Sequence, residues 1–246
     1  MRRSSRRTAR YRTTACLAAA AATVTLLTGC GSDDDPPAAP PVELTALGPV
    51  VPAAEVGEPF YDSADAMALR LLDEDDLPAG MVPAYDPADP DTRPASLPSP
   101  TTPPGCGKVL MALGHQRPET LAWTGVAYDG PEFAAIDIDV AAYREVGPAF
   151  TAVQETLARC AEYFGEDSEG VRIDYRLGAL DQPPAGDAST AFQLVMSSQG
   201  TTLVAQAALV QVGNTLVQIS VTAPEASDPA LLAQLTAAQV RALREK

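Results

Sequence analysis

Side chains able to perform catalysis are few in this sequence and lie far apart. Its one histidine, His115, falls in an expected loop, and no Gly-x-Ser-x-Gly motif provides a nucleophile for it to activate. Asp137 and Asp139 share one face of an expected strand, and a pair of carboxylates can hydrolyse glycosides. Carboxylates also solvate the exposed face of a sheet, which is the interpretation we favour. We therefore predict no catalytic residues and no enzymatic activity, and a hydrolase that uses this carboxylate pair is the weakest alternative.

Residues able to bind a metal are also sparse. Neither Cys106 nor Cys160 has a Cys or His neighbour at zinc-ligand spacing. The acidic runs 73–76 and 166–169 lack the spaced oxygens and the central glycine of a calcium-binding loop, which leaves weak incidental binding open. No glycine-rich phosphate loop lies between an expected strand and helix. We expect no metal site and no cofactor.

Cys30 carries a different chemistry. Six arginines open the chain, an apolar run of about 13 residues follows, and Leu27-Thr28-Gly29-Cys30 ends the run. This order is typical of a secretory signal, and the run is shorter than the roughly 20 residues that cross a bilayer. The last four residues resemble the lipobox of bacterial lipoproteins, which implies removal of residues 1–29 and acylation of Cys30 with chains such as palmitate.

Two or three acyl chains attach a protein stably to a membrane. We therefore expect a lipoprotein at the cell membrane, anchored to the extracytoplasmic face through the lipid on Cys30. The pair Arg6-Arg7 leaves both Sec and twin-arginine export open.

The charge balance narrows the possible partners. The 246 residues hold 17 Lys and Arg against 32 Asp and Glu, a formal charge of −15, and loss of the arginine-rich leader makes the mature chain more acidic still. Nucleic acids and anionic lipid headgroups are bound by Lys and Arg, so this balance argues against both. Solubility outside the cell explains the charge most simply, and binding of cations or basic peptides is the alternative.

Two cysteines remain for the folded part, because Cys16 leaves with the leader and Cys30 is acylated. An even pair in an oxidising compartment predicts a disulfide between Cys106 and Cys160. The bond would close a loop of about 55 residues and contribute roughly 4 kcal/mol on the chain-entropy model. Two buried free thiols are the alternative.

The sequence divides into a leader at 1–29, a tether at 30–62 and a single domain at 63–246. The tether is rich in proline and aspartate and has little apolar surface to bury, so it is not expected to order itself. Strands are expected at residues 81–85, 121–128, 133–142, 171–177, 191–196, 201–212 and 215–222. Helices are expected at residues 63–72, 106–113, 147–164 and 228–243.

The pattern within these strands decides the fold class. Residues 134–140 alternate apolar and polar side chains, which indicates one covered and one wet face. We therefore predict an α+β fold with a mainly antiparallel sheet of about six or seven strands and helices packed on one face.

Aromatic residues with a polar edge lie on or beside the expected strands. They are Trp123, Tyr128, Tyr143 and Tyr175. Such side chains can line a pocket for an amphiphile or a sugar, which makes these four our candidate ligand-binding residues. Core packing or cover of a sheet edge explains them at least as well.

Several of these features occur together in one known group. The stretch 71–81 reads Leu-Leu-Asp-Glu-Asp-Asp-Leu-Pro-Ala-Gly-Met, Cys106 lies on the next expected helix, Cys160 lies near the end of a later one, and Gly186-Asp187 forms an expected turn. With the lipobox, this pattern resembles actinobacterial lipoproteins that have a sensor domain similar to the extracellular part of the mycobacterial kinase PknH.

The resemblance implies a mixed sheet with helices around a cleft, and a role in binding an unidentified extracellular ligand. The PknH domain is expected to contain two disulfides, whereas this chain can form one and has no kinase domain. We therefore expect a non-enzymatic domain that binds a small molecule, lipid or peptide as a sensor. A carrier of lipid or another amphiphile in the cell envelope is the alternative, and it requires a large apolar cavity.

Overall fold

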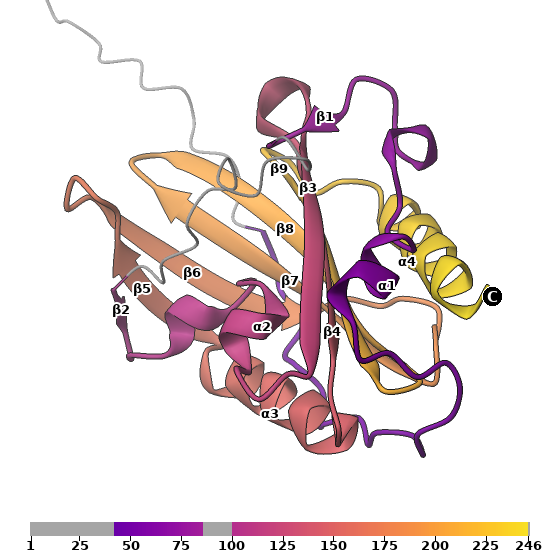
Figure 1. Cartoon of the computed structure of the whole chain (residues 1–246). Helices are drawn as coiled ribbons and strands as arrows, with labels where there is room; N and C mark the ends of the chain where they lie inside the picture. Colours follow the sequence, from indigo (N-terminus) through magenta and orange to yellow (C-terminus); the bar gives the residue numbers. More distant parts are fainter. Residues whose placement is uncertain (1–41, 86–99, 246) are drawn as a thin grey trace, which may run out of the picture. The chain divides into compact units, whose positions relative to one another are not determined.

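The computed structural model describes residues 42–85 and 100–245 (Figure 1). Within these ranges, no helix has both the length and the apolar character needed to cross a bilayer. Cys30, the leader and the first part of the tether lie outside the described residues, so removal of the leader and acylation of Cys30 stay predictions.

Nine antiparallel strands form one sheet in the described part of the chain, in the order β1-β3-β4-β9-β8-β7-β6-β5-β2. The strands are β1 (Val82–Pro83), β2 (Thr101–Thr102), β3 (Ala122–Asp129), β4 (Ala135–Ala142), β5 (Glu162–Glu166), β6 (Arg172–Ala179), β7 (Ala188–Ser198), β8 (Thr201–Val212) and β9 (Thr215–Ala223). The α+β class and the antiparallel pairing are confirmed, but the strand number of six or seven was too low. The two additional strands are β2, which lies in a proline-rich stretch, and β5, which lies in a stretch expected to be helical.

Two of the helices are longer than two turns. The helices are α1 (Ala64–Ala68), α2 (Leu113–Gln116), α3 (Val146–Arg159) and α4 (Pro229–Arg244), with the 3-10 turns η1 (Glu74–Asp76), η3 (Cys106–Lys108) and η4 (Pro131–Phe133). α4 begins as predicted, because the Asp228 carboxylate accepts a hydrogen bond from the Ala230 amide at 2.9 Å. α3 ends at Arg159, earlier than expected, since Tyr163 pairs with Tyr175 in the sheet.

Helices cover both faces of the sheet, which corrects the expectation that they cover one. Side chains alternate between the two faces along a strand, so Ile138 and Ala141 of β4 point in opposite directions. Ile138 packs in one core cluster with Leu232 of α4, and Ala141 packs in another with Phe150 of α3. The face expected to be wet is therefore largely covered, and Asp139 on that face is only 7% exposed.

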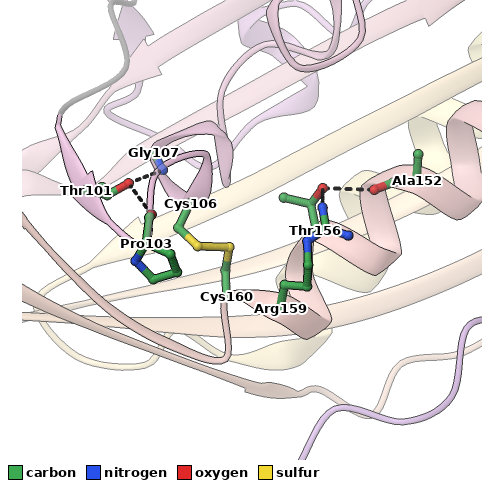
Figure 2. The surroundings of a disulfide bond; sticks show 8 residues. All are labelled: Thr101, Pro103, Cys106, Gly107, Ala152, Thr156, Arg159 and Cys160. Atoms are coloured by element: carbon green, nitrogen blue, oxygen red, sulfur yellow. Dashed lines mark hydrogen bonds between the residues drawn. A yellow bond between two sulfur atoms is a disulfide. The ribbon is translucent and has the colours of Figure 1, made fainter.

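The predicted disulfide between Cys106 and Cys160 is confirmed, with the two Cα atoms 5.5 Å apart (Figure 2). It joins η3 to the end of α3, and each cysteine is 2% exposed. The helix expected at 106–113 is replaced by η3, a turn and α2. Leu110 in that turn has a φ of 62°, a left-handed conformation that interrupts a helix.

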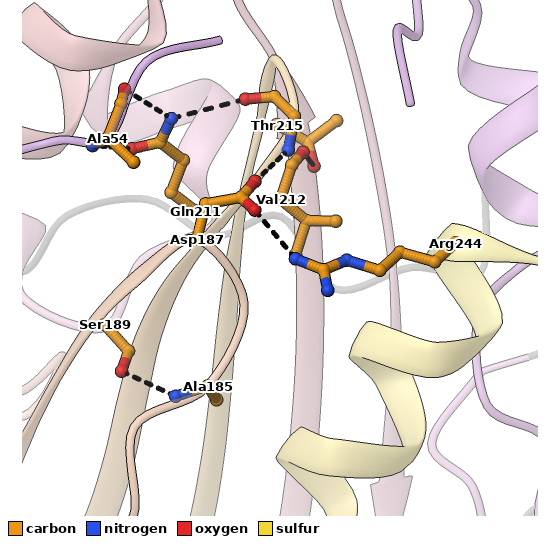
Figure 3. Close-up of polar contacts among 9 residues, drawn as sticks. Ala54, Ala185, Asp187, Ser189, Gln211, Val212, Thr215 and Arg244 are labelled. Atoms are coloured by element: carbon orange, nitrogen blue, oxygen red, sulfur yellow. Dashed lines mark hydrogen bonds and ion pairs between the residues drawn. The ribbon is translucent and has the colours of Figure 1, made fainter. Parts of the chain in front are cut away.

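Residues 42–61, here called the strap, lie against the domain and are held by buried carboxamide side chains. Gln154 of α3 accepts a hydrogen bond from the Val51 amide at 2.8 Å and donates one to the Val51 carbonyl at 3.1 Å. Gln211 of β8 binds both backbone groups of Ala54 in the same way, at 2.9 and 3.0 Å (Figure 3). Each of these side chains therefore satisfies the amide and the carbonyl of one strap residue, as the backbone of a neighbouring strand would.

Asn214, in the turn between β8 and β9, is the third side chain that holds the strap. Its side chain binds the amide and the carbonyl of Tyr61, both at 2.7 Å. The strap adds a single bridge to the sheet, between Thr45 and Ala179. The part of the expected tether from residue 42 on thus lies on the domain, because buried side chains supply hydrogen bonds that a proline-rich backbone cannot make with itself.

Candidate functional site

A cavity of about 610 Å³, here called the cleft, opens between α3, α4 and the strap. Strap residues 47–51 form one wall, and the loop that follows β6 forms another. The remaining walls come from α3, α4 and the strands β7 and β8. Segments from five parts of the sequence therefore meet around one space.

The cleft exists because β6 is too short to pair with the first residues of β7. β6 ends at Ala179, opposite Phe192, whereas β7 begins at Ala188 and pairs only with β8 over its first four residues. The chain after β6 leaves the sheet at this point and folds back beside it, where the Ala185 amide donates a hydrogen bond to Ser189 Oγ at 2.9 Å (Figure 3). The space is thus left open between the loop and the helices.

Gly186 and Asp187 fix the far end of this loop. Gly186 has a φ of 63°, and a Cβ atom there would overlap the carbonyl oxygen of Gln211, so glycine is required. The Asp187 carboxylate accepts a hydrogen bond from the Gly213 amide at 2.7 Å and pairs with the Arg244 guanidinium at 2.7 Å (Figure 3). The loop is therefore tied to the β8–β9 turn and to the end of α4.

The walls of the cleft are mainly apolar. Leu157, Leu180 and Phe192 supply apolar surface. Thr236 of α4 also lines the cleft and is 4% exposed, and its buried Oγ1 has no hydrogen-bond partner among the described residues. A buried hydroxyl without a partner costs free energy. The volume falls within the range of about 300–1,000 Å³ that small-molecule sites occupy.

The cleft has no acid–base pair in the part of the chain that the structure describes. Asp181 is its one ionisable lining residue, and it is exposed. The carboxamide of Gln154 is occupied by the strap. This arrangement can hold an apolar molecule, but it supplies no activated nucleophile and no general base beside one.

The four candidate aromatic residues lie in separate places, and none of them lines the cleft. The Trp123 ring lies 5.0 Å from the His115 ring, centroid to centroid, on the side of the sheet near α2. The Tyr128 hydroxyl donates a hydrogen bond to the Leu72 carbonyl at 2.9 Å, and burial raises its pKa. The ligand-binding role of these residues stays a prediction, and the four side chains do not line a common pocket among the described residues.

The other two aromatics pack inside the domain. Tyr143 belongs to the core beneath α3 and is 1% exposed, and burial raises its pKa. Tyr175 stacks on Tyr163 with ring centroids 4.5 Å apart, and burial raises the pKa of both phenols. Their polar edges are thus kept in the neutral form by the core.

The residues weighed for catalysis are also outside the cleft. Asp137 accepts a hydrogen bond from Ser220 Oγ at 3.4 Å. Asp139 lies over Gly125, where a Cβ atom would come within 2.5 Å of its Oδ1. His115 is exposed. Across residues 42–85 and 100–245, no cluster of three His, Cys, Asp or Glu could hold a metal ion.

Comparison with known proteins identifies the fold. No protein-family model matches the chain, and no curated protein matches it. Among solved structures, it is similar to the extracellular domain of PknH from Mycobacterium tuberculosis, with a TM-score of 0.56 and 14% identity over 74% of this chain and 96% of that one. An uncharacterised protein of Mycobacterium smegmatis, the Rv0999 ortholog, gives a TM-score of 0.37 and 11% identity over 70% of this chain and 93% of that one.

The similarity to the PknH extracellular domain confirms the expected resemblance at the level of the fold. The chain is a domain with the architecture of the PknH extracellular domain. The weaker similarity adds nothing to that conclusion. What this domain binds must be argued from its own cleft, because fold alone does not define function.

Proposed function

We propose that this protein is a lipoprotein anchored to the extracytoplasmic face of the cell membrane, and that its domain is a non-enzymatic sensor that binds a mainly apolar ligand in the cleft. The observation that carries the binding role is the mainly apolar cavity of about 610 Å³. A ligand with a mainly apolar body matches these walls. The likeness to an extracellular kinase domain supports the extracytoplasmic placement.

Native mass spectrometry of the protein purified from its own envelope tests the binding role. Ala237 and Ala230 are both exposed residues of α4, but only Ala237 lines the cleft. We expect a co-purified small molecule on the parent protein and on Ala230→Trp, and its loss in Ala237→Trp, because the indole fills the space. Equal retention in both variants, or no bound molecule together with no thermal stabilisation by any envelope extract, would contradict the proposal.

Fractionation tests the anchor separately. Cys30→Ala should release the protein from membranes that have been washed with high salt and carbonate. Cys16→Ala should leave it attached, because that residue lies in the leader. Membrane retention of the Cys30→Ala protein would remove the anchoring proposal and leave the binding proposal standing.

A carrier of lipid or another amphiphile is the second candidate, and the apolar walls of the cleft favour it. A carrier must release its cargo to an acceptor membrane, whereas a sensor need not. Transfer of a fluorescent fatty acid between two vesicle populations, blocked in Ala237→Trp and not in Ala230→Trp, would favour the carrier.

A further inference from the structure

A second depression, of about 350 Å³, lies beside the disulfide and shares no lining residue with the cleft. We call it the basic depression, because Lys108, Arg117 and Arg159 line it and no carboxylate does. Eleven Lys and Arg residues follow Cys30 in this sequence, against 32 Asp and Glu. Three of those eleven therefore converge on one small space in a strongly acidic chain.

The positive charge in this depression is only partly balanced. Arg117 pairs with Glu119 through one terminal nitrogen, and its buried Nε has no acceptor in the described part of the chain. Arg159 donates a hydrogen bond to the Thr156 hydroxyl at 3.0 Å, which orients its guanidinium without neutralising it (Figure 2). Neither Lys108 nor Arg159 forms an ion pair with a described residue. Two positive charges are thus left without a counter-charge.

The disulfide holds these cations together. Lys108 lies in η3 two residues after Cys106, and Arg159 directly precedes Cys160. The crosslink fixes η3 against the end of α3, and with it the backbone positions from which Lys108 and Arg159 extend. Groups fixed in advance around a site lose little conformational entropy when a ligand arrives. The same bond that stabilises the fold therefore preorganises the depression.

We infer that the basic depression binds a dianionic phosphoryl group, and the cleft plays no part in this inference. Guanidinium groups match the geometry of phosphate oxygens, and an ammonium adds a compact point charge. A dianion would neutralise the two uncompensated cations, which a single carboxylate would not. A phosphate monoester carries close to two negative charges at neutral pH, whereas the phosphodiester of a glycerophospholipid carries one, so the expected source is inorganic phosphate or a soluble phosphate monoester and not a lipid headgroup.

Titration of the purified protein with inorganic phosphate, at constant ionic strength, tests the inference by calorimetry and thermal shift. The variant Lys108→Gln/Arg159→Gln removes two charges from the depression. The matched control Arg144→Gln/Arg241→Gln removes two exposed arginines that lie elsewhere. We expect saturable binding to the parent and the control, and at least about tenfold weaker binding to the first variant, since each charge-assisted hydrogen bond is worth about that factor.

Vesicles distinguish the two sources of a phosphoryl group. We expect no binding of the Cys30→Ala protein to phosphatidylcholine vesicles with or without phosphatidylglycerol. Binding to the anionic vesicles that is lost in Lys108→Gln/Arg159→Gln would keep the site and reassign its ligand to a headgroup. The inference would be overturned if the parent showed no saturable phosphate binding and the Cys30→Ala protein no vesicle binding, or if all variants bound equally.

Discussion

Single buried polar side chains decide much of what this domain can do. Gln154, Gln211 and Asn214 each satisfy both backbone groups of one strap residue. Thr236 is the opposite case, a buried hydroxyl that nothing in the described chain satisfies. The sequence alone could not distinguish these residues from other polar residues. Their hydrogen bonds depend on contacts between segments more than 100 residues apart. It pointed to four aromatics for the ligand, and none of them lines the cleft.

Thr236→Val should raise or leave unchanged the stability of the ligand-free protein, by about 0–2 kcal/mol, because it replaces an unpaired buried hydroxyl with a methyl group of similar shape. The control is Thr215→Val, since the buried Thr215 hydroxyl donates to the Val212 carbonyl at 2.7 Å, and its loss should cost about 1 kcal/mol (Figure 3). Urea unfolding measures both. A clear loss of stability in Thr236→Val would mean that its hydroxyl has a partner.

Alkaline pH should destabilise the fold through buried phenols. The pKa values of Tyr143 and Tyr163 are raised above 10.0 by burial, so the folded protein keeps both protons while the unfolded chain releases them near pH 10. Their contribution to stability is therefore full below pH 10 and falls above it, by about 1.4 kcal/mol per pH unit for each tyrosine. Unfolding free energies measured from pH 9 to 11.5 should show this fall, and Tyr143→Phe should make it shallower. Ionisation of Tyr143 below pH 11 in the folded protein, seen as absorbance at 295 nm, would contradict it.

At the scale of elements, the sequence predicted best where one local pattern decides the structure. The alternation in β4 and the aspartate at the start of α4 placed both elements to within two residues. β5 was missed because Phe164 continues the helical spacing of Leu157 and Cys160, and only pairing with β6 reveals the strand. The second covered face was missed because Asp137 and Asp139 look solvated when β4 is considered without α2 and α3.

Loss of the disulfide should cost the fold about 4 kcal/mol, since the bond closes a loop spanning 54 positions in sequence. Denaturation of the parent with and without a reductant, and of Cys106→Ser/Cys160→Ser, measures the cost. The reductant should have no further effect on the double variant, which is the control. An unchanged midpoint after complete reduction would show that packing around η3 and α3 suffices without the bond.

At the scale of the whole molecule, the fold class could be predicted but the cleft could not. Strand pattern gives an antiparallel α+β domain, whereas the cleft depends on where β6 stops relative to β7 and on a strap that looked like a tether. Val50, Val56 and Phe60 of the strap are between 40% and 57% exposed, whereas Leu47, Val51 and Tyr61 pack against the core clusters. Hydrogen bonds from the carboxamides therefore hold the strap together with these apolar contacts.

Gln154→Leu/Gln211→Leu should free the strap while the sheet stays folded, because four strap hydrogen bonds disappear at about 1 kcal/mol each. Hydrogen–deuterium exchange should speed up at Val51 and Ala54 and change little in β4. The control Gln199→Leu alters an exposed glutamine in the turn between β7 and β8, outside the cleft, and should leave strap exchange as it was. Unchanged protection of the strap in the double variant would show that other contacts hold it.

The docked strap would also set how far the domain can lie from the lipid proposed on Cys30. Twelve residue steps separate Cys30 from Val42, where the described strap begins, so the leash spans at most about 40 Å. Undocking as far as Pro59 would lengthen it to about 100 Å. Strap residues 47–51 are also a wall of the cleft, so an occupant that packs against this wall would favour the docked strap and keep the leash at its shorter length. Under the proposed function, occupancy of the cleft would thus limit the distance between the domain and the membrane, without any change in the sheet.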